Sequence, residues 1–242
     1  MDYVILNGKK STLVKGLMIQ SLPIISKPLM RTNIETIDGR AGDIITKLGY
    51  AAYDRVMKIG LFGDFDIYEV INFFNSEGEA IFSNEPDKVY EYQILQQIDF
   101  EKLLRFRQAE VVFHCQPFKY SSTSSMVEWG NSQTSVTVFN GGNTYAAPII
   151  HLYDSNGFAQ TKAITIDGVT AAIIEKPSGA TSTWTWMEID VAKMKATAYQ
   201  ETGKPSMDRY ISCDYRNLYL SPGSHVIGSG YGHDILKYER WI

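Results

Sequence analysis

The sequence predicts a mainly β protein with one helix, an α+β fold. An N-terminal antiparallel sheet or split barrel carries the helix, and a C-terminal β-sandwich or jelly roll follows. Short segments rich in β-branched and aromatic residues alternate with turn residues along most of the chain. Apolar residues recur at helical spacing within residues 64–76. The polar run Ser-Ser-Thr-Ser-Ser at 121–125 is unsuited to a core, so we divide the chain into domains 1–122 and 123–242.

In the N-terminal domain, strands are expected where β-forming residues end at turn residues. The expected strands span residues 3–6, 11–20, 80–82, 89–95 and 109–115. Asn7-Gly8 is a strong turn pair, so the first two strands are expected to form a hairpin. Segments 33–38 and 50–61 flank the glycine-containing motif Asp38–Asp43, and a further turn is expected at Asn84–Asp87.

The helix is expected to run from Asp64 to about Ser76. Its apolar residues recur three and four apart, as on one face of a helix: Ile67, Val70, Ile71 and Phe74. Asp64 or Asp66 can accept hydrogen bonds from the first free amides, and Gly78 can end the helix.

The C-terminal domain is predicted to be β throughout. Its expected strands span residues 133–139, 147–153, 163–166, 169–174, 183–189 and 195–199. The closing segment 210–241 is expected to form a strand, a tight turn at Pro222-Gly223 and a second strand. Leu218 and Leu220 are two residues apart in that segment and are expected to face the same side.

Composition indicates a folded structural protein. Of the 242 residues, 44% are hydrophobic and 21% charged, which disfavours disorder. The net charge of −4 argues against specific nucleic-acid binding, which needs a concentrated basic surface. Apolar runs stay short of the about 20 residues of a membrane span, and the N-terminus lacks the basic segment of a secretory signal.

Local charge and cysteine patterns favour structural roles. Lys102, Arg105 and Arg107 are interleaved with acidic neighbours and are expected to form a solvated or interface face. Cys115 and Cys213 lie far apart in apolar, strand-like contexts, and we expect buried free thiols. No Cys-x-x-Cys or paired-histidine pattern suggests a metal, so we expect no metal and no cofactor.

Several motifs together resemble one protein family. They are Asp38-Gly-Arg-Ala-Gly-Asp43, the aromatic and proline element Phe113–Tyr120, Asn140-Gly-Gly-Asn-Thr-Tyr-Ala-Ala-Pro148, and the closing segment. Their order along the chain resembles that of the distal tail proteins of bacteriophages with long, non-contractile tails, the siphovirus tail component family. The residues that carry the resemblance are Gly39, Arg40, Gly42, Pro117, Tyr120, Asn140, Pro148, Asp214, Leu218, Pro222 and Gly223. Cys213, Ser224 and His225 depart from the family pattern at turns.

This resemblance implies a structural function in the virion tail, assembled in the host bacterial cytoplasm. Distal tail proteins form one or two homohexameric rings. The N-terminal domain, here 1–122, builds the ring, and a galectin-like sandwich, here 123–242, projects outward. The implied partners are further copies of the chain, the major tail tube protein and the tail-associated fibre or lysin protein. The tape-measure protein and the receptor-binding or baseplate proteins are further implied partners, and the central channel passes DNA.

Ring formation implies heterologous contacts between copies, and exposed strand edges of the first domain are candidates for them. We expect the sheet to continue from one copy to the next through such edges.

Two other functions remain open. Trp184 and Trp186 lie two apart, so in a strand they share a face and could stack on a sugar, as in a carbohydrate-binding module that contacts the host wall. The favoured interpretation is that both tryptophans pack inside the sandwich. A hydrolase is the third possibility, because a Ser-His-Asp set is spatial and need not show in the sequence, although no Gly-x-Ser-x-Gly element surrounds a serine. We expect no catalytic residues.

Overall fold

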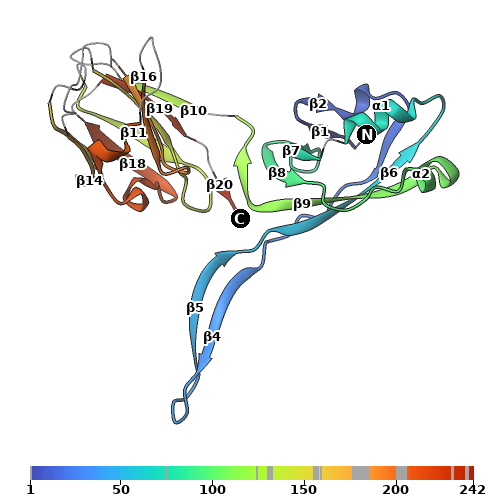
Figure 1. Ribbon diagram of the computed structural model, residues 1–242, viewed down its shortest axis with the longest axis horizontal. Helices are drawn as coiled ribbons and strands as arrows, with labels where there is room; N and C mark the ends of the chain where they lie inside the picture. The colour runs from blue at the N-terminus through green and yellow to red at the C-terminus, as the bar shows by residue number, and fades with distance from the viewer. Residues whose placement is uncertain are drawn as a thin grey trace. The chain divides into compact units, whose positions relative to one another are not determined.

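Strands make up most of the chain (Figure 1). The computed structural model describes all residues except 1, 75, 124, 130–132, 155–157, 159, 176–185, 200–205, 230–231 and 238–239. Contacts divide it into two compact units, residues 1–122 with Ile242 and residues 123–241, which we call unit 1 and unit 2. The predicted mainly β, α+β fold class is confirmed.

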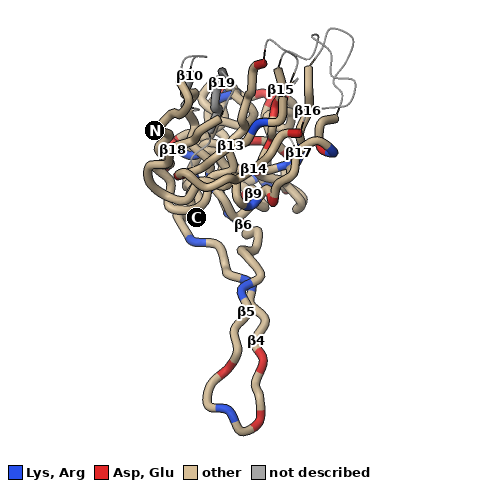
Figure 2. The backbone as a smooth tube through the Cα atoms, turned by 90° about the vertical axis from the view of Figure 1, so that its left-hand side faces the viewer, with Lys and Arg blue, Asp and Glu red and all other residues tan. Residues whose placement is uncertain are grey.

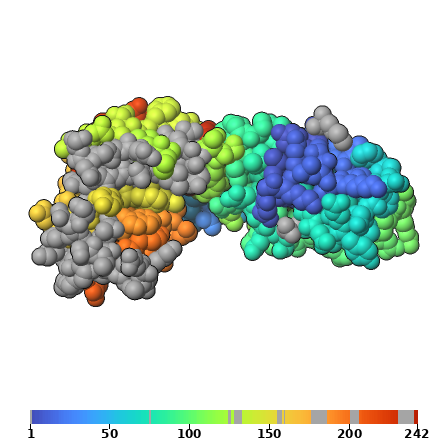
Figure 3. All heavy atoms as spheres, turned by 90° about the horizontal axis from the view of Figure 1, so that it is seen from above, coloured from blue at the N-terminus to red at the C-terminus, as the bar shows by residue number. Residues whose placement is uncertain are grey.

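Unit 1 is built on a curved antiparallel sheet. Its strands are β1 (Val4–Leu6), β2 (Lys9–Lys10), β3 (Leu17–Ser21), β6 (Tyr53–Leu61), β7 (Glu77–Phe82), β8 (Lys88–Gln93) and β9 (Gln108–Ser121). The spatial order is β2-β1-β7-β8-β9-β6-β3. Figure 3 shows the N-terminal segment, in blue, packed closely against the later segments of this unit. Residues 11–20 are not one strand, because the 3₁₀ helix η1 (Ser11–Leu13) precedes β3.

The structure contains one α-helix more than the sequence analysis expected. The predicted helix is present but shorter, as α1 (Ile67–Phe73), and Asp66 caps it by accepting from the amides of Tyr68 and Glu69. The second helix, α2 (Phe100–Phe106), contributes the buried Leu103 to the core, and the partly buried Phe100 packs against it. The signal was present in the sequence, because Phe100, Leu103 and Leu104 recur three and four apart and Asp99 can cap the helix, but only the charges of this segment were considered.

A two-stranded arm interrupts unit 1 between β3 and β6. It consists of β4 (Met30–Thr36) and β5 (Asp43–Tyr50), which pair with each other and with no other described strand. Figure 2 shows the arm projecting away from the sheet, with charges of both signs along it. The arm is therefore a free hairpin and not part of the unit 1 sheet.

Unit 2 contains two five-stranded antiparallel sheets. One has the order β10 (Ser125–Trp129), β19 (Gly232–Lys237), β12 (Ile149–Tyr153), β15 (Trp186–Asp190), β16 (Lys195–Tyr199). The other has the order β11 (Ser135–Asn140), β18 (Gly223–Ser229), β13 (Lys162–Ile166), β14 (Val169–Ile174), β17 (Ile211–Ser212). β20 (Arg240–Trp241) ends the unit. Fully buried side chains from both sheets, such as Ile150, Met187, Ile164 and Ile227, share one core.

The closing segment differs from its predicted strand, turn and strand. The 3₁₀ helix η2 (Asp208–Tyr210) precedes the short β17, and a further 3₁₀ helix, η3 (Tyr215–Leu218), follows it. Leu218 and Leu220 are both fully buried in the unit 2 core, although Leu218 ends η3 and does not lie in the expected strand. Among the described residues, no helix has the length and apolar character needed to cross a membrane.

Both cysteines are free thiols. Cys115 is fully buried, and burial raises the pKa of its thiol to about 12 from the ordinary 9.0. Cys213 is partly buried, and its thiol pKa is also raised, mainly by burial. Neither thiol is therefore activated for nucleophilic chemistry.

We predict that alkaline pH destabilises the protein through Cys115. The folded thiol pKa exceeds the unfolded one, so this contribution is complete below about pH 9 and is lost as the pH rises from 9 to 12, by up to about 1.4 kcal/mol per unit. Urea unfolding at pH 8, 9, 10 and 11 measures the effect. In Cys115→Val the decline should be shallower. An equal decline in both proteins would contradict the prediction.

Candidate assembly site

The arm carries branched apolar side chains on both of its faces, and several of them are exposed. Ile34 and Ile45 are paired across the two strands and are 59% and 61% exposed. Ile44, paired with Glu35, lies on the opposite face, and Leu48 is exposed at the irregularity in the pairing. A lone hairpin is at best marginally stable in water, and apolar side chains gathered on one are typical of interaction sites. The arm has the character of an element that another surface covers.

The tip of the arm holds the motif residues Gly39, Arg40 and Gly42. Both glycines have positive φ, +82° and +79°, with open space around the position a Cβ would take. Glycine is therefore favoured at both positions by the backbone conformation, which it adopts without strain, and not by a lack of space for a side chain. The amide of Arg40 donates to the carbonyl of Ile37 at 3.1 Å, which closes the turn.

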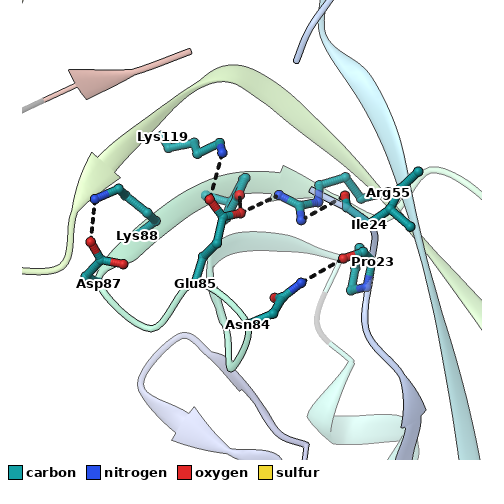
Figure 4. Close-up of polar contacts among 9 residues, drawn as sticks. Pro23, Ile24, Arg55, Asn84, Glu85, Asp87, Lys88 and Lys119 are labelled. Carbon is teal, nitrogen blue, oxygen red and sulfur yellow. Dashed lines mark hydrogen bonds and ion pairs between the residues drawn. The ribbon is translucent and has the colours of Figure 1, made fainter. Parts of the chain in front are cut away.

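Two hydrogen bonds hold the segment that enters the arm (Figure 4). The Arg55 Nη2 donates to the carbonyl of Ile24 at 3.3 Å, and the Asn84 Nδ2 donates to the carbonyl of Pro23 at 2.9 Å. Arg55 lies on β6, the strand that follows the arm. The same side chain thus ties together the chain segments before and after the arm.

Arg55 is only 2% exposed and lies between aromatic rings. Its guanidinium carbon is 4.1 Å from the ring centroid of Tyr90 and 4.9 Å from that of Phe82. Its Nη1 is 3.7 Å from the Glu85 Oε2, within ion-pair distance, and neither Nε nor Nη1 has a hydrogen-bond partner among the described residues. The ring faces and one nearby carboxylate therefore replace much of the water that the cation loses.

Glu85 is the anionic centre of this cluster. The Lys119 Nζ donates to its Oε1 at 2.8 Å, and the Tyr90 hydroxyl donates to its Oε2. Burial, and then the hydrogen bond to Glu85, raise the pKa of the Tyr90 hydroxyl far above its ordinary value, so it stays a donor. Two buried cations thus share one carboxylate (Figure 4). We call Arg55, Glu85, Tyr90 and Lys119 the root cluster.

Aromatic contacts also anchor the base of the arm, at its second strand. Tyr50, the last residue of β5, meets the ring of Phe118 edge to face at a centroid distance of 6.1 Å. The Lys27 ammonium lies 6.0 Å from the centroid of the Tyr50 ring. The amide of Ala51 donates to the carbonyl of Leu29 at 2.8 Å. The arm is therefore held at its base and free along its length.

The sequence analysis missed the root cluster. One signal was available, because Arg55 alternates with Tyr53, Met57 and Ile59 and so shares the core-facing side of its strand. An arginine in such a row needs a buried partner. Glu85 and Lys119 could not be identified as partners, since they lie far away in the sequence.

Pro117 and Tyr120 lie on β9, in the second half of that strand. Between the β8 pairs made by Cys115 and Lys119, β9 holds more residues than β8, and Pro117 lies in this bulge. Proline lacks the amide donor that a regular ladder needs, so a bulge suits it. Tyr120 resumes the pairing with β8.

Asn140, at the end of β11, is a buried hydrogen-bonding centre in unit 2. Its Nδ2 donates to the carbonyls of Thr144 and Leu220, each at 2.9 Å, and of Ser221 at 3.2 Å. Its Oδ1 accepts from the amide of Gly142 at 3.0 Å. Asn140 therefore joins two loops to the strand, which is a folding role.

The other motif residues of unit 2 also lie at structural positions. Pro148 is buried just before β12, and Leu218 is in the core. Asp214 caps η3 by accepting from the amide two residues later at 3.0 Å. Pro222 precedes Gly223, which pairs with Asn140 and opens β18 with φ +119°. Asn140, Pro222 and Gly223 are thus brought together, whereas the arm-tip glycines belong to unit 1.

The tryptophan pair is only partly described. Trp184 lies outside the described residues. Trp186 is partly buried on the outer face of its sheet, because the next residue, Met187, points into the core. The expectation that Trp186 packs inside the sandwich is therefore wrong. Its ring stacks on that of Tyr199, with centroids 3.7 Å apart, and meets His151 edge to face, so one indole face is already covered.

Unit 2 does form a Ser-His-Asp set. The His225 Nδ1 lies 2.8 Å from the Asp167 Oδ2, and its Nε2 lies 3.1 Å from the Ser221 Oγ. Nε2 is also 2.9 Å from the carbonyl oxygen of Ser221, which can only accept. Pro222 follows the serine and has no N–H, so the usual oxyanion donor after a nucleophile is missing. Asp167 also accepts from the amide of Val226 at 2.8 Å.

The hydrogen bonds of Asp167, His225 and Ser221 therefore connect turns to β18, which is a structural role. The Val226 amide, and then His225, hold the pKa of the Asp167 carboxyl below its ordinary value, which keeps it charged. Among the described residues, no group of three or more His, Cys, Asp or Glu could hold a metal ion.

Comparison with known proteins supports the family resemblance at the level of the fold. No model of a known protein family matches the sequence, and no curated protein matches it. The SPP1 Dit protein (gp 19.1), a paradigm of the hub adsorption apparatus in phages infecting Gram-positive bacteria, is similar over 100% of both chains, with a TM-score of 0.69 and 14% identity. A chain of the phage P2 baseplate in its activated conformation with Ca covers 100% of this chain and 98% of its own, with a TM-score of 0.57 and 8% identity. A chain of the corresponding baseplate with Sr gives 98% of both chains, a TM-score of 0.53 and 9% identity. The fold is that of phage tail hub proteins, as the sequence motifs indicated.

We predict that Glu85→Gln destabilises the protein by about 3 kcal/mol, because it leaves two buried cations without their carboxylate. Glu101→Gln is the matched control, since the Glu101–Arg105 pair is more than two-thirds exposed and should contribute below about 0.5 kcal/mol. Urea unfolding of the three proteins measures both changes. Similar small losses in both variants would show that the root cluster does not hold the fold.

Proposed function

We propose that this chain is a non-enzymatic structural protein of a phage tail tip. In this proposal, residues 1–122 form a homohexameric ring around a central channel, and residues 123–242 form a galectin-like sandwich directed outward. The ring joins the tail tube to the tail-associated fibre or lysin protein, or to a baseplate. Its place is the siphovirus virion tail, after assembly in the host bacterial cytoplasm.

The single observation that carries the proposal is the free arm in a chain that has the tail-hub fold over its whole length. The arm presents apolar side chains that unit 1 does not cover, and the root cluster fixes its base. Covering these side chains on a neighbouring copy would remove apolar surface from water. An interface between two different surfaces of the same chain is heterologous, and it closes into a ring when the rotation per copy allows.

The partners follow from this adaptor role. The tail tube protein and the fibre or lysin protein would contact opposite sides of the ring. The tape-measure protein and DNA would use its opening, and receptor-binding or baseplate proteins would attach outside. We propose no specific nucleic-acid contact, because the charges along the arm are of both signs (Figure 2).

A second candidate function is a carbohydrate-binding module that contacts the host wall. One observation favours it, because Trp186 lies on the outer face of its sheet beside Tyr199 and His151. Aromatic rings on a surface suit the apolar faces of sugars. The stacking of Trp186 on Tyr199 weighs against it, since that ring face is occupied.

We predict that wild-type protein is multimeric in solution and that Ile34→Glu/Ile45→Lys is monomeric but equally stable. The two residues are exposed and directly opposite, so opposite charges preserve the hairpin while preventing its burial. Light scattering and native mass spectrometry measure the mass, and urea unfolding measures stability.

Val169→Glu is the control, because it places a charge at an equally exposed apolar residue of unit 2 and should leave the mass unchanged. The ring proposal would be contradicted if wild-type protein stayed monomeric at every concentration in solution and showed no rings in negative-stain images.

We predict that a glycan array gives no binding above background, because the face of Trp186 against Tyr199 is unavailable to a sugar. Calorimetry with any array hit checks the result. Binding at millimolar affinity or tighter that is lost in a folded Trp186→Ala variant would favour the carbohydrate-binding function instead.

A further inference from the structure

We infer that unit 1 binds a small monovalent anion, of which chloride is the common one, beside Arg55 in its interior. The donors are the N–H groups of Arg55 that have no acceptor among the described residues and the buried hydroxyl of Tyr53. This anion site belongs to the fold of a single chain, and it holds whether or not copies of the chain assemble into a ring.

The described residues leave three buried donor atoms of this region without a hydrogen-bond partner. They are the hydroxyl oxygen of Tyr53 and the Nε and Nη1 of Arg55. A buried donor without an acceptor is costly, and more so when it belongs to a charged group. Such groups in folded proteins are commonly satisfied by a bound water or ion.

The donors lie close to one another. Tyr53 and Arg55 are two residues apart on β6, so both side chains lie on the core-facing side of that strand. Cys115 is directly opposite Tyr53 on β9. Burial raises the pKa of the Tyr53 hydroxyl and of the Cys115 thiol, and in each case the Arg55 cation opposes the rise, so the guanidinium is near both groups. Both groups therefore stay protonated at neutral pH and can donate.

The charges favour an anion over a neutral water molecule. The root cluster holds Arg55 and Lys119 against Glu85, a net charge of +2 − 1 = +1. Asp87 and Lys88 lie beside the cluster and pair with each other, so their charges cancel (Figure 4). A buried charge without a counter-charge is strongly unfavourable. One bound anion would neutralise the root cluster and accept from its free donors, whereas a water molecule would do only the second.

A small inorganic ion suits the site better than a carboxylate of another chain. Arg55 is 2% exposed, and the rings of Tyr90 and Phe82 lie 4.1 and 4.9 Å from its guanidinium carbon. An acidic side chain from outside could therefore reach the guanidinium only if the core opened. The nearby Asp54 is turned to the opposite face of β6, where it lies 2.8 Å from the His114 Nδ1.

Bromide can identify the site directly, because it replaces chloride and scatters anomalously. The full chain is unfolded in urea, refolded in sodium bromide and crystallised from the same salt, so that the core closes around the ion. Data collected at the bromine absorption edge should show an anomalous peak within hydrogen-bond distance of the Arg55 guanidinium and the Tyr53 hydroxyl. Density of a water molecule there without an anomalous peak, or bromide at the surface only, would overturn the inference.

Urea unfolding measures the same binding in solution. Sodium chloride replaces sodium gluconate at constant total salt, so that the screening of surface charges stays the same. An ion that binds only the folded chain raises the folding equilibrium constant, by up to about tenfold for each tenfold rise in chloride above the Kd. Wild-type protein should show this chloride dependence.

Three variants locate the effect. Tyr53→Phe keeps the ring but removes the hydroxyl, so the chloride dependence should weaken. Arg55→Met removes the cation, so the dependence should be lost. Arg105→Met is the matched control, because Arg105 is an arginine of the same unit that is 71% exposed, and this variant should keep the full dependence.

The outcomes separate a built site from a general effect of salt. An equal chloride dependence in wild type, Tyr53→Phe and Arg105→Met would overturn the inference, and so would a wild-type protein whose stability does not change with chloride. If Arg55→Met does not fold, the comparison of Tyr53→Phe with Arg105→Met and the bromide peak decide. None of these measurements depends on the oligomeric state.

Discussion

The position of the arm depends on one buried cation. Arg55 is almost fully removed from water and is surrounded by two aromatic ring faces, one carboxylate at ion-pair distance and one backbone carbonyl. A hydrophobic residue of similar size could pack there at comparable stability. Such a hydrophobic residue could not donate to the carbonyl of Ile24 and would offer Glu85 no cationic partner on β6. The root cluster is therefore better explained as a device that fixes where the arm leaves the sheet than as a source of stability.

Much of the fold could be predicted because alternation and capping act locally. Asp66 caps a helix where expected, and Leu218 and Leu220 are both buried, although a 3₁₀ helix capped by Asp214 replaces the expected strand there. The local sequence pattern could not show which other parts of the chain pack against a strand. The segments beside Asp38–Asp43 were recognised only as flanking a glycine-containing turn, and whether their strands join the sheet or stand apart from it depends on long-range pairing. For the same reason Trp186 was assigned to the wrong face of its sheet.

The residues of unit 2 that suggested chemistry have structural bonding. Asn140 satisfies carbonyls of two loops, and Asp167 with His225 ties a turn to β18. A buried loop carbonyl without a partner costs free energy, so polar side chains recur wherever loops cross the end of a sandwich. Serine, histidine and aspartate serve this purpose as well as they serve catalysis. Their proximity becomes evidence for an active site only when an oxyanion donor accompanies it, and Pro222 removes the expected one.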